Sequence, residues 1–168
     1  MKLKIKIKTN SEVTFPSIIK KGEWIDLYAA EDVDIIAPRY NKGNSTIEFN
    51  LRLIPLGVRM KLPHGFEAIV APRSSTPKNF GIIQSNSLGI IDNSYSSNED
   101  EWKFPALSLR NNAIKKGDKI CQFRIQLSQK ASFWDKLRWL FTSGIKLVQV
   151  DDLGNNSRGG FGSTGKRK

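Results

Sequence analysis

Hydrophobic and polar residues alternate along much of the chain with the period of a half-buried β-strand. The clearest case is residues 2–8, where Leu3, Ile5 and Ile7 alternate with lysines, which places the apolar side chains on one strand face. Other short apolar runs are bounded by turn clusters such as residues 41–44 and 63–65. The predicted strands are 2–8, 24–29, 47–54, 57–61, 66–72, 81–84, 103–109, 120–126 and 145–150. Many short strands with turns between them indicate an all-β fold, a barrel or sandwich.

The lysines at positions 2, 4, 6 and 8 share the other face of the first strand. A row of lysines on a strand is typical of a solvated face that protects the edge of a sheet. The alternative is a binding surface for an anion, and we favour the solvated edge.

One short helix is predicted directly after Arg73. Ser74 or Ser75 would be its N-cap, and Pro77 would lie in its first turn, where a missing backbone N–H costs little.

A second helix is predicted over residues 132–141. Ser132 is the candidate N-cap, Asp135 completes a capping pattern three residues later, and Gly144 stops the helix. Its apolar stripe is Phe133, Trp134, Leu137, Leu140 and Phe141. We expect this stripe to pack on the barrel; the alternative is an exposed aromatic surface for a protein partner. With the stripe packed, Trp139 and the acidic residues 99–101 are left as the more exposed partner candidates. Residues 96–101 are predicted to form a surface loop.

The bulk properties indicate a single-domain protein of the cytoplasm. The chain has 168 residues, and its longest apolar runs are too short to span a membrane. The alternating N-terminus lacks the apolar region of a signal peptide. Cys121 and His64 are the only cysteine and histidine, which excludes an internal disulfide and a His/Cys zinc site within one chain.

The net charge of +11 favours a polyanionic partner, either nucleic acid or a multiply charged small molecule. Residues 158–165 read Arg-Gly-Gly-Phe-Gly-Ser-Thr-Gly, with the glycine spacing of a dinucleotide or P-loop motif. Both motifs require a helix after the glycines, and three residues follow here. We therefore expect a globular domain over residues 1–156 and a flexible glycine-rich arm over 157–168 that closes on a bound nucleotide.

Two further clusters carry polar groups suited to nucleotide chemistry. Residues 71–75 read Ala-Pro-Arg-Ser-Ser and combine a forked cationic donor with two hydroxyls, which suits an anion site. Residues 86–95 contain Gly89, Asp92 and Tyr95: a sharp hairpin, a candidate general base and a ring that could pack on a sugar.

Five blocks in this order resemble the trimeric dUTPase family: residues 25–30, 71–75, 89–95, 117–122 and 158–165. The third and fifth blocks are specific, and together the five span most of the chain. The resemblance implies a jelly-roll-like β-barrel, a homotrimer with active sites shared between subunits, and Mg²⁺-dependent cleavage of dUTP to dUMP and pyrophosphate. Mg²⁺ on a triphosphate prefers oxygen ligands, so no histidine is required.

The resemblance also implies a role for each matching residue. Asp92 would activate the attacking water, and Gln122 would orient it. Tyr95 would pack under deoxyribose and exclude a 2′-hydroxyl, while Asp26 would act through the waters of the metal. Uracil would be bound by Asn86, Gly89, Ile90 and Ile91 and stacked by Phe161. The phosphates would be held by Arg73, Ser74, Ser75, Arg158, Gly162, Ser163 and Thr164.

Three departures from the family pattern bear on these roles. Glu23-Trp24-Ile25 replaces the usual Ala-Gly before Asp26, Ser96-Ser97 replaces the arginine-glycine after Tyr95, and the predicted helix at 132–141 lengthens the link between the last two blocks. Such insertions resemble phage-encoded members, some of which bind a repressor protein. The alternatives are an enzyme resembling dCTP deaminase and a non-enzymatic basic regulator or nucleic-acid-binding module. The single aromatic in the basic tail argues against the module, and we expect no stable binding of nucleic acid.

Overall fold

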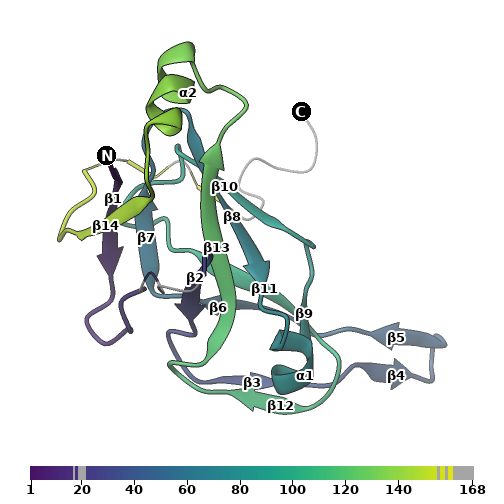
Figure 1. Ribbon diagram of the computed structural model, residues 1–168. Coiled ribbons are helices and arrows are strands. Elements are labelled where there is room, and N and C mark those ends of the chain that lie inside the picture. Colours follow the sequence, from purple (N-terminus) through teal and green to yellow (C-terminus); the bar gives the residue numbers. More distant parts are fainter. Residues whose placement is uncertain (17, 19–21, 155, 158, 161–168) are drawn as a thin grey trace.

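The computed structural model describes residues 1–160 except 17, 19–21, 155 and 158 (Figure 1). Short strands dominate, with two short helices, α1 (Thr76–Phe80) and α2 (Phe133–Leu140). The strands are β1 (Leu3–Thr9), β2 (Ile25–Tyr28), β3 (Val33–Ile35), β4 (Arg39–Asn41), β5 (Thr46–Glu48), β6 (Leu51–Pro55), β7 (Val58–Lys61), β8 (Phe66–Pro72), β9 (Ile82–Gln84), β10 (Gly89–Asp92), β11 (Lys103–Ser108), β12 (Asn112–Ile114), β13 (Lys119–Leu127) and β14 (Ile145–Gln149). The predicted all-β fold is confirmed.

The strands form small sheets around one apolar core. The largest sheet has the order β10-β8-β13-β2 with antiparallel neighbours, and β14-β1-β7 and β6-β11-β9 are three-stranded. Along β8, Phe66, Ala68 and Val70 are buried, whereas the alternate residues are partly exposed. Trp102 and Phe123 meet edge to face in the core, with their ring centroids 5.4 Å apart. One face of each main strand therefore supplies the core, and the other face is available for polar groups.

The lysine-bearing strand β1 lies inside its sheet and not at the edge. It pairs in parallel with β14 on one side and antiparallel with β7 on the other. Leu3, Ile5 and Ile7 are fully buried while Lys4 and Lys6 are exposed. The predicted alternation is confirmed, and the predicted edge position is wrong, because the partner β14 comes from a segment 140 residues away in the chain.

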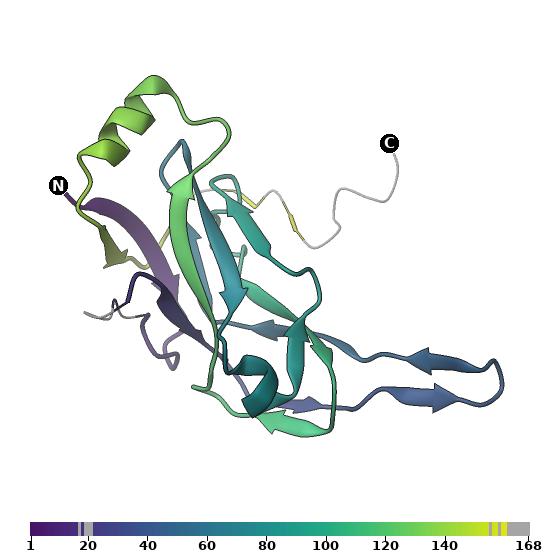
Figure 2. The same ribbon diagram turned by 45° about the vertical axis from the view of Figure 1, so that its right-hand side comes forward.

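The predicted strands all recur: 66–72 has the predicted bounds, the others have shifted ends, and one of them is divided. Residues 47–54 split into β5 and β6, and β5 pairs with β4 in a two-stranded ribbon that projects from the body (Figure 2). The strands β3, β4, β10 and β12 were not predicted as strands. Each is only three or four residues long, too short for a period-2 pattern to stand out.

Helix α1 begins as predicted, with Ser75 as N-cap and a proline in its first turn. Helix α2 also begins as predicted: Ser132 accepts from the Asp135 N–H, and Asp135 accepts from the Ser132 N–H, which is a complete capping box.

The packing predicted for α2 is wrong. None of its residues is buried, and Trp134 and Phe141 are 73% and 65% exposed. The aromatic side chain of α2 that packs on the body is Trp139, which meets Phe66 edge to face at 5.5 Å, and Asp135 contacts His64 at 3.2 Å. Helix α2 stands at one end of the molecule (Figure 1), and its residue that packs against the core is Trp139. Most of the apolar stripe therefore faces outward.

Residues 96–101 also differ from the expected surface loop. Ser96, Ser97 and Asp100 are almost completely buried. The Asp100 carboxylate accepts hydrogen bonds from the backbone N–H groups of Ser96 and Ser97 at 3.0 and 2.9 Å. These bonds compensate the buried charge, which is why an acidic loop without apolar anchors can fold inward.

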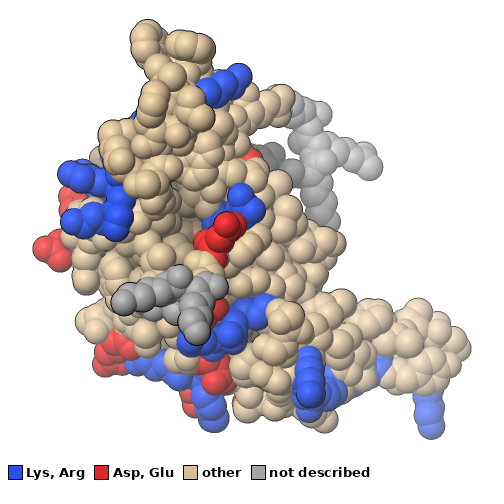
Figure 3. Space-filling view, in the orientation of Figure 1, with Lys and Arg blue, Asp and Glu red and all other residues tan. Residues whose placement is uncertain are grey.

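On the face shown in Figure 3, lysine and arginine side chains form several separate groups, with acidic side chains between some of them. The described residues of this face therefore do not form one continuous basic patch. Among the described residues, no helix has the length and apolar character required to cross a bilayer.

Candidate active site

A pocket of about 230 Å³ opens beside the tight turn that joins β9 to β10. Its lining combines the predicted base-binding residues with side chains from the neighbouring strands β9 and β11. The lining residues are Val70, Gln84, Asn86, Gly89, Ile90, Ile91, Tyr95, Trp102, Lys103, Pro105 and Gly160. The structure therefore brings Asn86, Gly89, Ile90, Ile91 and Tyr95 together, as the sequence predicts.

The tight turn between β9 and β10 brings the backbone of residues 86–89 to the pocket. Leu88 N–H donates to the Asn86 carbonyl at 2.6 Å, and Ser87 has a positive φ of 60°. Gly89 pairs with Val70 of β8, and a Cβ at Gly89 would lie only 3.3 Å from side-chain atoms of both Val70 and Gln84. The absence of a side chain here lets the main chain approach the strand behind it.

Tyr95 forms one wall of the pocket and is held at both ends. Its hydroxyl donates to the Glu101 carbonyl at 3.0 Å, and its backbone N–H donates to the Asp92 carbonyl at 3.2 Å. A Cβ at Gly160 would lie 2.7 Å from the ring, so Gly160 allows the chain to pass directly over Tyr95. The ring is thus a fixed surface on which a flat or cyclic ligand can pack.

Asp92 is the last residue of β10 and is half-buried. Its Oδ1 accepts from the Ser94 backbone N–H at 2.8 Å and from the Ser94 hydroxyl. These bonds orient one oxygen of the carboxylate. An oriented, partly exposed carboxylate beside a pocket is suited to accept a proton from water.

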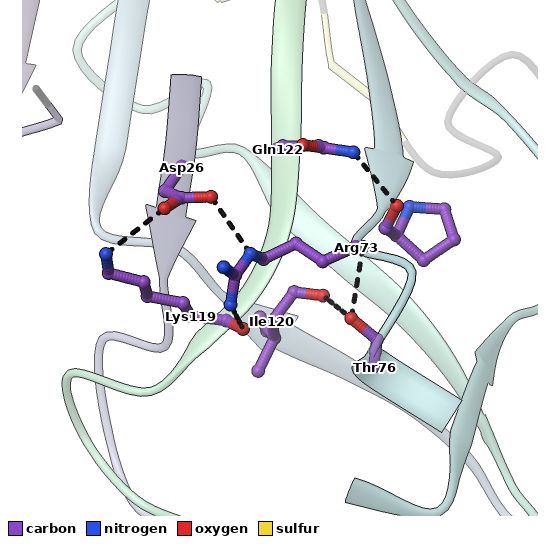
Figure 4. Close-up of polar contacts among 7 residues, drawn as sticks. Asp26, Arg73, Thr76, Lys119, Ile120 and Gln122 are labelled. Carbon is purple, nitrogen blue, oxygen red and sulfur yellow. Dashed lines mark hydrogen bonds and ion pairs between the residues drawn. The ribbon is translucent and has the colours of Figure 1, made fainter. Parts of the chain in front are cut away.

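A second cluster lies at the far end of β8, around a buried ion pair (Figure 4). The Asp26 carboxylate, 8% exposed, contacts the Arg73 Nε at 3.0 Å and the Lys119 Nζ at 3.2 Å. Arg73 and Lys119 are themselves 33% and 45% exposed. Two cations share this one carboxylate, which suits an anionic ligand, although the exposed Glu23 also lines the pocket beside them.

Thr76 fixes the turn that carries Arg73. Its buried hydroxyl accepts from the Arg73 backbone N–H at 3.0 Å and donates to the Ile120 carbonyl at 2.7 Å (Figure 4). The Arg73 guanidinium also donates to the Lys119 carbonyl at 3.5 Å. The turn after β8 is therefore held to β13 by hydrogen bonds from its side chains to the β13 backbone.

Ser74 and Gln122 line a shallow pocket of about 290 Å³ beside Asp26 and Arg73. Gln122 Nε2 donates to the Pro72 carbonyl at 3.4 Å. Ser74 is exposed and Ser75 is half-buried without a side-chain capping bond. The predicted residues Asp26, Arg73, Ser74 and Gln122 thus meet in one place, with Ser75 next to them.

The two clusters do not meet within one chain. Asp92 pairs with Glu67 and Gln122 pairs with Ala71, on opposite sides of β8. With about 3.3 Å per residue along a strand and about 4.8 Å between strands, the two Cα atoms are about 16 Å apart. That distance is too long for both side chains to hold the same water molecule.

The predicted arm residues Arg158, Phe161, Gly162, Ser163 and Thr164 lie outside the described residues. The stretch just before them is anchored, because the Ser157 hydroxyl donates to Asp100 Oδ1 at 2.6 Å. Gly159 N–H donates to the Ser157 hydroxyl at 3.1 Å. The base of the arm is therefore attached close to Tyr95.

The donor atoms available to a metal are few. Within the described ranges, no group of three or more His, Cys, Asp or Glu residues is placed to hold a metal ion. Asp26 is one carboxylate at a cationic site, which fits a Mg²⁺ that keeps its waters and is bound mainly by phosphate oxygens. Burial, with Asp26 nearby, raises the pKa of the Cys121 thiol, which keeps the thiol protonated at neutral pH.

Several residues of both clusters were not assigned from the sequence. Lys119 belonged to the fourth block without a role, and Thr76 and Trp102 carried no polar pattern that singled them out. Gln84 had a detectable signal: it is an amide in the apolar run Ile82-Ile83-Gln84, and a polar residue that ends a buried strand often contacts a ligand or a buried carbonyl.

Comparison with known proteins gives a consistent family. A family model described as dUTPase matches residues 25–134. The chain is 48% identical over 166 residues to the SPbeta prophage-derived deoxyuridine 5'-triphosphate nucleotidohydrolase YosS of Bacillus subtilis (strain 168), covering 98% of this chain and all of that protein. It is 31% identical to the deoxyuridine 5'-triphosphate nucleotidohydrolase of Finegoldia magna, covering 98% and 99% of the two chains.

Solved structures agree on the fold. The dUTPase from Streptococcus mutans superposes with a TM-score of 0.60 at 21% identity, over 73% of this chain and 94% of that one. A mutant dUTPase from phage phi11 of S. aureus, described with a structural Mg(II) ion, gives 0.58 at 16% identity over 77% and 94%. At these identities the structures support the dUTPase fold and nothing finer.

Proposed function

The chain belongs to the dUTPase family, and we propose that it hydrolyses dUTP to dUMP and pyrophosphate at a site completed by a second copy of the chain. This activity would keep uracil out of DNA and supply dUMP. The observation that carries the proposal is the pocket beside β10, which is lined by the base-binding block and Tyr95, with Asp92 at the end of the same strand. The chemistry of each part supports the same reaction.

The pocket beside β10 suits a deoxyuridine. The backbone of the turn before β10 and the Asn86 side chain offer hydrogen-bonding groups to a base. The Tyr95 ring offers a flat surface to the sugar. Because the Tyr95 hydroxyl is bonded to Glu101, the ring cannot easily move away from an added 2′-hydroxyl. Steric exclusion by a fixed ring would favour deoxyribose over ribose.

The cluster at the far end of β8 suits the triphosphate. Arg73 and Lys119 share one carboxylate, so their combined charge exceeds that of Asp26 and attracts phosphate oxygens. Ser74 and Ser75 add hydroxyl donors beside them. Arg158, Gly162, Ser163 and Thr164 would complete this cradle from the arm, and Phe161 would cover the base.

Asp92 would remove a proton from the water that attacks the α-phosphorus. The carboxylate is oriented by Ser94, and a positioned general base contributes roughly 10²–10⁴-fold to a rate. Gln122 would hold the same water through its amide.

Mg²⁺ would neutralise charge on the phosphates as pyrophosphate leaves. Asp26 would hold it through water molecules, since its carboxylate oxygens already contact Arg73 and Lys119. The role of the protein is then to bind and orient the Mg²⁺–triphosphate complex with these three side chains.

A second copy is required to bring Asp92 near Gln122. The two lie about 16 Å apart in one chain by strand geometry, whereas symmetric oligomers can place different parts of two identical surfaces at one interface. A homotrimer with three shared sites satisfies this requirement, in line with the family.

The test is release of pyrophosphate from dUTP by the purified protein with Mg²⁺, beside dCTP and UTP. We expect dUTP to be hydrolysed and dCTP and UTP to be left unchanged. Release of ammonia from dCTP would instead indicate a deaminase, and no turnover of any nucleotide would favour a non-enzymatic binding protein.

Binding of a repressor protein is the second candidate function, favoured by the outward-facing aromatic residues of α2. The double change Trp134→Ala and Phe141→Ala should then abolish binding of a purified phage repressor and leave dUTP hydrolysis unchanged. If the wild type and the double variant bind the repressor equally, α2 is not part of such an interface.

A further inference from the structure

The lysine row of β1 lies on an internal strand. Lysines on an edge strand protect that edge from pairing with another chain, but β1 lies between β14 and β7 and pairs with both (Figure 1). Lys4 and Lys6 are exposed, on the face opposite the buried aliphatic residues of the strand. Edge protection therefore does not account for these cations.

The neighbouring strands add further cations to the same face. Three cross-strand pairs join two cations each: Lys4 with Lys146, Lys6 with Lys61, and Lys8 with Arg59. Aligned residues of paired strands have their side chains on one face, and like charges directly opposite each other destabilise a sheet. The sequence keeps this repulsion where neutral or acidic residues would remove it. Such a face is stabilised when an anionic partner covers it.

An ion pair forms at one end of this face, where Arg59 contacts Glu101 at 3.7 Å. Within the described part of the chain, no ion pair includes Lys4, Lys6 or Lys146. Residues two apart on a strand are about 6.6 Å apart and neighbouring strands about 4.8 Å, so the Cα atoms of these three lysines lie within about 8 Å of one another. We call them the lysine cluster, and their positive charge is concentrated without a paired carboxylate.

The chemistry of this face favours a nucleic-acid duplex over other polyanions. A duplex carries one negative charge per about 1.7 Å of its axis, so one backbone reaches several cations at once. Proteins that bind single strands stack the bases on aromatic side chains, and none of the residues aligned on this face is aromatic. Membrane-binding surfaces combine cations with apolar side chains that enter the lipid, whereas Val148, the apolar residue aligned with Lys6, is half-buried.

We propose that the lysine cluster binds the phosphate backbone of duplex DNA without reading its sequence. Phosphate contacts release counterions, so the binding is strong at low salt and weakens steeply as salt is added. The contact departs from the expectation that nucleic acid is not stably bound, because the internal position of β1 leaves its lysines without a role at an edge. The cations of the candidate active site, Arg73 and Lys119, belong to a different sheet region, around β8 and β13. The two anion sites are therefore separate in the chain.

Fluorescence anisotropy with a short labelled DNA duplex that contains no uracil tests this contact over a range of salt concentrations. The variant combines three exposed changes, Lys4→Gln, Lys6→Gln and Lys146→Gln. The matched control removes the same charge from exposed lysines elsewhere, by Lys42→Gln, Lys130→Gln and Lys136→Gln. Thermal unfolding verifies that both proteins fold, and the single change Lys4→Gln replaces the triple variant if that protein does not fold.

We expect the wild type to bind the duplex at about 50 mM salt. In the triple variant the affinity at this salt concentration should fall at least about tenfold. The slope of log affinity against log salt should become shallower by about 2–3, since each lost phosphate contact removes about 0.9 from it. The single variant should change the slope by about 0.9, and the control should keep the slope of the wild type.

Equal losses in the triple variant and the control would overturn the proposal, since the net charge and not this face would then govern binding. A wild type that does not bind the duplex at the lowest salt concentration would also overturn it. Tighter binding of a single strand of the same length, or binding of phosphatidylserine vesicles in place of the duplex, would assign the face to a different polyanion and reject duplex DNA. Because the readout is binding of DNA, failure of the protein to hydrolyse dUTP would be a separate result.

Discussion

Asp92 and Gln122 face the same strand, β8, from opposite sides and lie across from residues four positions apart, Glu67 and Ala71. Asp92, the last residue of β10, lies beside the start of β8. Gln122 lies beside the end of β8, with Asp26 and Arg73. One chain thus contains both halves of the proposed site and holds them apart. The proposed function therefore requires a second copy to join them.

Subunit mixing tests this arrangement. Asp92→Asn and Arg73→Ala proteins should each have very low activity, since each removes one half of every site. Unfolding and refolding a 1:1 mixture should restore about one site in four, because random assembly pairs an intact Asp92 with an intact Arg73 at that frequency. The measurement is pyrophosphate release by the mixture and by each variant refolded alone. A mixture no more active than the two variants would place each site within a single chain.

The change Asp92→Asn should lower kcat by roughly 10²–10⁴-fold because an amide cannot accept the proton of the attacking water. Binding of a non-hydrolysable dUTP analogue should remain within a few-fold of wild type, since the asparagine can still accept from Ser94. Turnover above a third of the wild-type value would exclude Asp92 as the base.

Tyr95 should determine the discrimination against ribose. The change Tyr95→Ala removes the ring that Glu101 and Gly160 hold in place, so dUTP should bind more weakly and the dUTP/UTP ratio of kcat/KM should fall. Tyr95→Phe keeps the ring and removes only the bond to Glu101, and it should change this ratio much less. If Tyr95→Ala leaves the ratio intact, another residue excludes the 2′-hydroxyl.

Asp100 should make the stability of the fold depend on pH. Burial acts to raise its pKa, but hydrogen bonds from Ser157, Ser97 and Ser96 outweigh burial and hold the pKa below the usual 3.8. A carboxylate with a lowered pKa stabilises the folded state above the unfolded pKa and loses that contribution as the pH falls through the folded value. Asp100→Asn should therefore lower the Tm at pH 7, and its deficit should shrink as the pH falls below about 4. A deficit that does not change with pH would mean that the charge of Asp100 is not stabilising.

Helix α2 should be attached mainly through Trp139. Trp139→Ala removes the contact with Phe66 and should cost about 1–3 kcal/mol, less than the 3–5 kcal/mol or so typical of a fully buried tryptophan. Trp134→Ala is the matched control on the same helix, and at 73% exposure it should change the free energy of unfolding by less than about 0.5 kcal/mol. Denaturant titration of both variants measures the difference, and equal losses would contradict the observed packing.

Local sequence patterns determined a large part of this protein. The alternation in residues 2–8, the proline and serine around α1, and the capping box of Ser132 and Asp135 each act between neighbours in the chain, so each could be read without a structure. The order of the five blocks similarly predicted that Asn86, Gly89, Ile90, Ile91 and Tyr95 lie at one pocket, because those residues are close in sequence.

The tertiary structure decided which distant segments meet. It placed β14 beside β1, turned the stripe of α2 outward, buried Asp100 under Ser96 and Ser97, and aligned Gln84 with Val70 and Asn86. It also separated Asp92 from Gln122 through the register of β10 and β13 on β8. An amphipathic pattern specifies that a face is apolar, but its partner is selected by the summed packing and hydrogen bonding of the whole chain, to which residues far apart in sequence contribute together.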